Sequence, residues 1–89
     1  MQALAHHRKE HYLLSRGTAG FKFKLLTQGA KPKFPLALQV EMVAGYAHET
    51  VCGTQEDLDA VARKLHNGFV RSVVFQTAPN HRIRIDVRG

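Results

Sequence analysis

The most regular hydrophobic pattern in the chain lies between Gly53 and Gly68. Apolar residues recur there at the spacing i, i+3, i+4, i+7, which draws one apolar stripe along a helix. They are Leu58, Val61, Ala62 and Leu65. The pattern predicts a helix over residues 54–67 with this stripe buried against the rest of the protein.

Both ends of this segment carry residues that start and stop helices. Thr54 followed by Asp57 fits a capping box, in which the hydroxyl accepts from a first-turn N–H and the carboxylate accepts from the N–H of the cap residue. Acidic residues occupy the first turn and basic residues the last, where each interacts favourably with the helix dipole. Asn67-Gly68 supplies a left-handed stop. All local signals therefore agree on one helix.

Alternation of apolar and polar residues predicts strands before this helix. In residues 21–25, two phenylalanines and a leucine alternate with Lys22 and Lys24, after a flexible turn over residues 17–20. We expect this first strand to place its rings in the core and its lysines in water. The basic, proline-containing loop over residues 28–33 would join it to the next strand in a hairpin.

The second expected strand spans residues 34–43, where Leu36, Leu38, Val40 and Met42 alternate with more polar positions. A helix remains open there, because Pro35 suits a first helical turn and some apolar residues also fit a helical stripe. Residues 46–52 look extended, as a third strand or as the far end of a long, bent second strand.

Two more strands are expected after the helix. Residues 69–76 are apolar on both faces, as in a central strand, with Phe69 and Phe75 facing the core. A turn over residues 77–80 then leads to a strand over residues 82–88, in which Ile83, Ile85 and Val87 alternate with charged residues. This last strand is the most clearly amphipathic one.

The N-terminal residues 1–16 have a loose helical register and a cationic, histidine-rich polar face. They predict a short helix or a basic arm that orders on a partner. Residues 17–89 are expected to form a single domain. Together the elements predict a two-layer α+β fold, with an antiparallel sheet of four or five strands and one main helix, 54–67, packed on one face.

Composition limits the chemistry of the chain. Its 89 residues are 44% apolar, enough for one packed core, and its single cysteine, Cys52, can form no internal disulfide. The N-terminus has no apolar run of the kind found in signal peptides or membrane spans, so we expect a soluble, cytoplasmic protein.

His7 and His11 stand four apart, as helical metal ligands can, but no third ligand accompanies them. No phosphate loop or nucleophile elbow is present, and we expect no enzymatic activity, metal or cofactor.

Charge is unevenly distributed along the chain. The formal net charge is +6. Residues 1–33 carry seven Lys/Arg and one acid, residues 34–62 carry five acids and no Lys/Arg, and residues 63–89 carry six Lys/Arg and one acid. A basic excess favours polyanionic partners through the long-range field.

Basic residues at strand positions form the one candidate site. On the expected strands 21–25 and 82–88, cations alternate at about 7 Å per step on one face. If these strands are neighbours, the rows merge and extend into the loop over residues 28–33, where they would match phosphates along a nucleic-acid backbone. The candidate residues are Lys22, Lys24, Lys31, Lys33, Arg82, Arg84 and Arg88.

The leading hypothesis is therefore a small, non-enzymatic protein that binds a nucleic-acid backbone, DNA or RNA, through a basic sheet face. The alternative is a small inhibitor or accessory factor, of the kind that phages and mobile elements direct against nucleic-acid-handling complexes such as CRISPR effectors. A homodimer is compatible with either hypothesis. Neither predicts membrane association.

Overall fold

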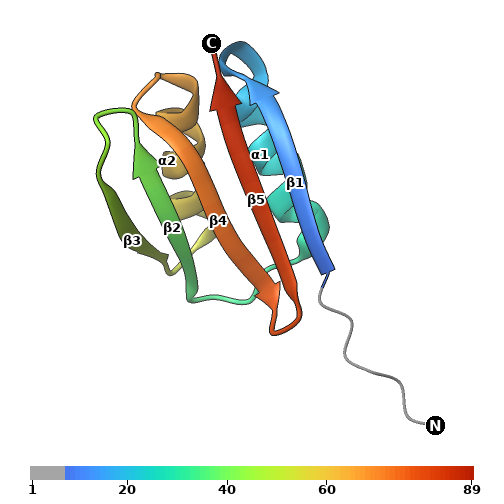
Figure 1. The fold of residues 1–89 in the computed structure, drawn as a ribbon. Helices are drawn as coiled ribbons and strands as arrows, with labels where there is room; N and C mark the ends of the chain where they lie inside the picture. Colours follow the sequence, from blue (N-terminus) through green and yellow to red (C-terminus); the bar gives the residue numbers. More distant parts are fainter. Residues whose placement is uncertain (1–7) are drawn as a thin grey trace, which may run out of the picture.

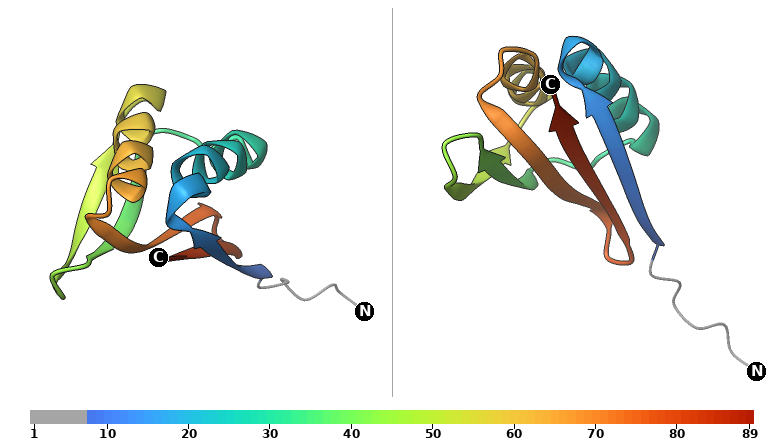
Figure 2. Two further views of the ribbon diagram at one scale, coloured as in Figure 1. Left: turned by 90° about the horizontal axis from the view of Figure 1, so that it is seen from above. Right: turned by 45° about the horizontal axis from the view of Figure 1, so that its top comes forward.

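The computed structural model describes residues 8–89, which form a five-stranded mixed sheet with two helices on one face (Figures 1 and 2). The elements in chain order are β1 (Arg8–Ser15), α1 (Arg16–Ala30), β2 (Leu36–Met42), β3 (Ala47–Cys52), α2 (Gln55–His66), β4 (Val70–Ala78) and β5 (His81–Arg88). The strand order across the sheet is β1-β5-β4-β2-β3. The α+β class and the two-layer arrangement are confirmed. Neither helix of this part of the chain is long and apolar enough to cross a membrane.

Helix α2 confirms the prediction for residues 54–67, including its cap. The Thr54 hydroxyl accepts a hydrogen bond from the Asp57 N–H at 3.3 Å, and the Asp57 carboxylate accepts from the Thr54 N–H at 3.2 Å. The same carboxylate accepts from the Gly53 N–H at 2.8 Å. The expected apolar stripe is buried: Leu58, Val61, Ala62 and Leu65. Local sequence signals and tertiary packing therefore agree in this helix.

The strand predicted over residues 21–25 is wrong, because these residues lie in α1. The buried face of this helix is instead formed by residues four apart, Ala19, Phe23 and Thr27. Of the apolar residues expected in the core, Phe23 is fully buried, whereas Phe21 is 67% exposed. The two-residue alternation in residues 21–25 therefore does not determine which side chains are buried; the four-residue helical spacing does.

Gly20 explains why this segment packs well as a helix. A Cβ atom at this position would lie 2.6 Å from the carbonyl oxygen of Ala62 in α2, so the two helices approach too closely for any side chain there. Arg16, the first residue of α1, donates to the carbonyl oxygens of Leu65 at 2.8 Å and Val70 at 2.7 Å, and so ties α1 to the end of α2. Gly20, one of the two glycines that suggest a turn over residues 17–20, is therefore the position at which α1 packs against α2.

The expected N-terminal helix is also wrong for the described part, since residues 8–15 form β1. The remainder of that predicted segment, residues 1–7, lies outside the described residues. Strand β1 pairs with β5 in parallel, which makes the sheet mixed where a purely antiparallel one was expected. Only Leu14 of β1 is buried, with Tyr12 packed at the edge of the core, so the alternation in β1 is too short to stand out in the sequence.

The remaining strands follow the predictions, with one change of phase. Residues 34–43 contain β2, residues 47–52 form a separate strand, and the last strand is β5. In β4 the pairing shifts between Ser72, opposite Glu41, and Val70, opposite Met42. This β-bulge turns Val70 toward the helices, and Phe69, expected in the core, is 61% exposed.

The core lies between the sheet and the two helices. Phe23 of α1 and Phe75 of β4 meet edge to face, with ring centroids 6.0 Å apart and planes at 79°. Ile83, Ile85 and Val87 of β5 are buried on the same side of the sheet. Because both helices cover this side, residues 8–89 place no helix on the other side of the sheet (Figure 2).

The helix contact predicts opposite effects for two glycines of α1. Gly20→Ala should destabilise the protein by about 1–3 kcal/mol, because overpacking at Ala62 outweighs the better helix propensity of alanine. Gly17→Ala should be neutral or stabilising by up to about 1 kcal/mol, because no atom lies within 4 Å of a Cβ at that position. Urea denaturation of both variants checks this, and equal effects would contradict the packing role of Gly20.

Candidate nucleic-acid interface

The side of the sheet opposite α1 and α2, which we call the open face, is built from alternate residues of all five strands. Strand register places these residues in rows, for example His11, Arg84 and Val74 on neighbouring strands. The members are Lys9, His11 and Leu13 of β1; Arg82, Arg84, Asp86 and Arg88 of β5; Ser72, Val74 and Gln76 of β4; Ala37, Gln39 and Glu41 of β2; and Ala47, Glu49 and Val51 of β3.

The structure divides the predicted site residues into separate groups. Arg82, Arg84 and Arg88 lie on the open face of β5, as alternation predicts. Lys22 and Lys24 lie on α1, on the other side of the sheet. The expected merging of the two rows therefore does not occur, because the lysine row belongs to a helix. The Lys24 ammonium nitrogen lies 4.0 Å from an Asp59 carboxylate oxygen of α2.

The two loop lysines also separate. Lys31 ends α1 in a left-handed conformation, with φ of 50°, and its N–H donates to the Gln28 carbonyl oxygen at 3.2 Å. Lys33 lies between α1 and β2 and lines a groove that it shares with Arg82. Of the predicted loop cations, Lys33 therefore belongs beside the open face.

Lys9 is a member of the basic surface that the sequence interpretation missed. It lies directly opposite Arg82 in the parallel pairing of β1 with β5. Both side chains are exposed, and no ion pair joins either of them to another residue within 8–89. The two-residue alternation of β1 places Lys9 in phase with the exposed His11 and Leu13, but only the pairing of β1 with β5 puts it beside Arg82.

Arg82 is the centre of this basic surface. It lines three adjoining depressions of about 660, 310 and 230 Å³ on the open face and its margin. Lys33 borders the largest, Arg84 borders the second, and Lys9 borders the second and third. We call Lys9, Lys33, Arg82 and Arg84 the basic cluster.

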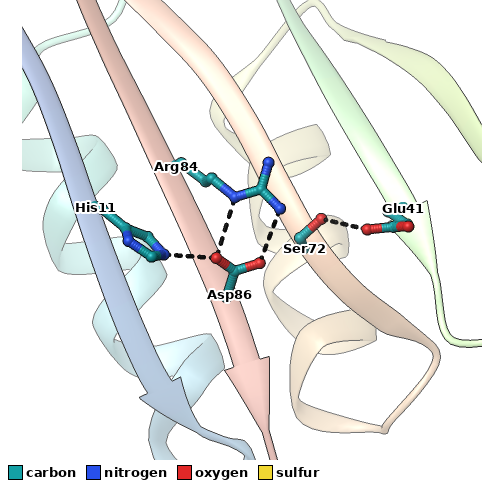
Figure 3. Close-up of polar contacts among 5 residues, drawn as sticks. All are labelled: His11, Glu41, Ser72, Arg84 and Asp86. Atoms are coloured by element: carbon teal, nitrogen blue, oxygen red, sulfur yellow. Dashed lines mark hydrogen bonds and ion pairs between the residues drawn. The ribbon is translucent and has the colours of Figure 1, made fainter.

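Arg84 differs from the other members because it is held by an acid of the same strand (Figure 3). Its Nε and one terminal nitrogen donate to the two carboxylate oxygens of Asp86 at 3.0 and 3.1 Å. A ring nitrogen of His11 lies 2.6 Å from the same carboxylate. The Arg84 bonds, followed by the His11 contact, hold the pKa of Asp86 below its usual value despite partial burial. Arg84 is therefore a partly neutralised cation.

The open face changes charge from one edge to the other. On β2, Glu41 accepts a hydrogen bond from the Ser72 hydroxyl at 3.2 Å, as Figure 3 shows. On β3, Glu49 accepts from the Gln39 amide at 3.1 Å. Cations thus gather on β1 and β5, whereas β2 and β3 carry carboxylates. An anionic ligand would be attracted to the first half and repelled from the second.

A second polar cluster lies on the helix side of the sheet, at the start of β1. The Glu10 carboxylate contacts the Tyr12 hydroxyl and a ring nitrogen of His81, whose other nitrogen lies 2.8 Å from the Thr77 hydroxyl. Bonds from Tyr12 and then His81 lower the pKa of Glu10, and the carboxylate in turn raises the pKa of Tyr12. This cluster joins three strands and contributes no cation to the open face.

The described residues offer no clear metal or thiol chemistry. Within 8–89, no group of three or more His, Cys, Asp or Glu side chains could hold a metal ion. Cys52 is buried, and burial raises the pKa of its thiol, which disfavours the reactive thiolate. His11 lies on a strand, so the helical spacing considered for His7 and His11 does not apply to it; His7 itself lies outside the described residues.

Comparisons with protein-family models, curated proteins and solved structures find no match for this chain. Function is therefore inferred from the geometry and charge of the open face.

The Asp86 network predicts a pH-dependent contribution to stability. Because the folded-state pKa of Asp86 is lowered, its contribution is present above the unfolded value of about 3.9 and is lost as the pH falls through the folded value. Asp86→Asn should cost about 0.5–1 kcal/mol at pH 7, since both partners are partly exposed, and much less near pH 2. Urea denaturation at the two pH values measures this, and a loss independent of pH would argue against the ion pair.

Proposed function

We propose that the protein binds the phosphate backbone of a nucleic acid through the basic cluster. The observation that carries this proposal is the position of Arg82. Its side chain is exposed, lies opposite Lys9 on the neighbouring strand and lines three depressions. It forms no ion pair inside residues 8–89. A cation without an internal partner can neutralise a phosphate and release its counterion without first giving up an ion pair.

The shape and spacing of the surface support a backbone contact. Arg82 and Arg84 are two residues apart on one strand, about 7 Å, so the two side chains can contact different phosphates. Lys9 widens the surface by one strand and Lys33 adds a cation from the loop before β2.

The composition of the open face favours binding that depends little on base sequence. In the part of the chain that the structure describes, this face carries no Phe or Tyr on which bases could stack. Tyr46 lies outside it, in the turn before β3, where its ring stacks on His48 with centroids 6.0 Å apart. Phosphate contacts position a protein on a nucleic acid without reading its sequence.

Salt dependence of binding tests the proposal. With duplex DNA, Arg82→Ala should weaken binding and flatten the slope of log K against log salt by about 0.9, the value for one phosphate contact. Arg63→Ala is the matched control, because it removes the same charge from α2 on the other side of the sheet. Fluorescence anisotropy with random duplex and single-stranded oligonucleotides measures both variants.

The expected result is a changed slope for Arg82→Ala and an unchanged slope for Arg63→Ala. Arg82→Lys should keep most of the affinity, because a phosphate contact mainly requires the positive charge. Equal slopes for the two alanine variants would contradict a specific role for the basic cluster. Affinity weaker than about 100 μM at about 150 mM salt would reject nucleic-acid binding altogether.

A protein partner is the second candidate, and an exposed apolar cluster favours it. Val43, Tyr46 and Phe69 are each more than half exposed and lie together where the β2–β3 turn meets the start of β4. The Val43 N–H donates to the Phe69 carbonyl oxygen at 3.0 Å, and the Met42 N–H to the Tyr46 carbonyl oxygen at 2.8 Å. Such a cluster suits an inhibitor or accessory factor that docks on a nucleic-acid-handling complex. This function would be favoured if the oligonucleotide titration showed no binding and if Arg82→Lys markedly weakened binding to a protein partner.

A further inference from the structure

Strand β1 forms a long, regular edge of the sheet. It has eight residues, pairs only with β5 among the described strands, and keeps one continuous register from Arg8 to Ser15. It contains no proline, and no β-bulge interrupts its pairing. Proline and β-bulges are two of the features that protect an edge from pairing with another strand, whereas charged side chains are a third, which β1 carries in Arg8, Lys9 and Glu10.

The backbone groups that face outward can be assigned from the parallel pairing. The Arg8 N–H donates to the Asn80 carbonyl oxygen at 2.6 Å, so Arg8 directs its backbone groups toward the neighbouring strand. Every second residue of a parallel pair does so. The N–H and C=O groups of Lys9, His11 and Leu13 therefore point away from β5, where residues 8–89 provide no strand to accept them.

Apolar side chains lie beside this edge on the helix side. A groove of about 310 Å³ between β1 and α1 is lined by Tyr12, Leu14, Lys22, Leu25 and Leu26. Leu25 is 53% exposed. A strand added to β1 would place alternate side chains beside this groove.

We propose that a second copy of the chain occupies this edge, with the two β1 strands antiparallel and the two sheets joined into one. The outward N–H and C=O groups of Lys9, His11 and Leu13 in one copy must then face those of the other. This requirement allows only a few pairing registers between the two strands. A register centred on Glu10 would place two carboxylates opposite each other, which is destabilising. A register centred on Tyr12 would place Glu10 opposite Leu14 of the second copy.

The register centred on His11 is self-complementary. It places Glu10 of each copy opposite Tyr12 of the other, so that no two carboxylates face each other, and Lys9 opposite Leu13. His11 faces His11 on the two-fold axis. Antiparallel pairing also keeps Arg8 and Lys9 of the two copies at opposite ends of the interface, which limits repulsion between two chains of net charge +6.

This interface does not depend on the proposed function, but it has a consequence for the open face. Lys9 and Arg82 lie on the two strands nearest the joined edge. Pairing would therefore bring the basic clusters of two copies to the middle of one continuous sheet, with the carboxylates of β2 and β3 at its outer margins.

Sedimentation of the full chain without nucleic acid tests the interface. Leu13→Pro removes an outward N–H, and the two-fold axis doubles the loss, so the dimer dissociation constant should rise by roughly tenfold or more. Leu13→Ala keeps that N–H and should change the constant much less. Proline is tolerated on an edge strand whose N–H faces outward, so Leu13→Pro should remain folded as judged by circular dichroism. A wild-type chain that sediments as a monomer at about 1 mM would overturn the proposal.

Cysteine cross-linking tests the register independently of Leu13→Pro. Residues that face each other in a hydrogen-bonded antiparallel pair have Cα atoms about 5.5 Å apart, within the range for disulfides. With diamide as oxidant, His11→Cys should therefore form a covalent dimer, whereas Leu13→Cys, whose two copies would lie about 13 Å apart, should not. Cys52 is buried and does not compete. Preferential cross-linking of Leu13→Cys, or none by either variant, would overturn this register.

Discussion

The close contact between α1 and α2 at Gly20 is the constraint on which the rest of the structure depends. Both helices must lie on one side of the sheet, and the absence of a side chain at Gly20 lets α1 approach the Ala62 carbonyl group of α2 directly. Arg16 reinforces this arrangement by donating to carbonyl groups at the end of α2 and the start of β4. With two helices side by side on one face, the core closes there and the other face carries mostly polar side chains.

The parts of the fold that could be predicted are those in which local signals and burial agree. Helix α2 has its cap, charges and apolar stripe in the sequence, and β5 has an unbroken alternation whose apolar members are all buried. Helix α1 lacks such signals: Ser15 makes no side-chain capping bond, and the first turn has no acid. Its alternating residues 21–25 imitate a strand, while the packing reason for Gly20 lies in a residue 42 positions away. The bulge that exposes Phe69 likewise depends on pairing with β2, which no local pattern reveals.

The candidate site was predictable only where the element that carries each residue was predictable. Arg82, Arg84 and Arg88 share a face because a strand alternates every two residues, and β5 was identified correctly. The error over Lys22 and Lys24 follows directly from the error over α1. Lys9 could not be added without knowing that β1 pairs with β5. The difference between Arg82 and Arg84 was also hidden, since alternation places Asp86 beside Arg84 but does not show that its carboxylate takes two of the guanidinium donors.

The distribution of charge over the sheet follows from its strand order. The two basic segments of the sequence meet because β1, from the first, pairs with β5, from the last, whereas the acidic middle segment supplies β2 and β3. A single chain therefore has a basic side and an acidic side, and its basic side ends at β1, the longer of the two edge strands within residues 8–89. Charge on the open face and unpaired backbone groups at the edge are separate properties, but the topology places them next to each other. The basic surface and the sheet edge thus share β1: its alternate side chains belong to the first, and its outward backbone groups belong to the second.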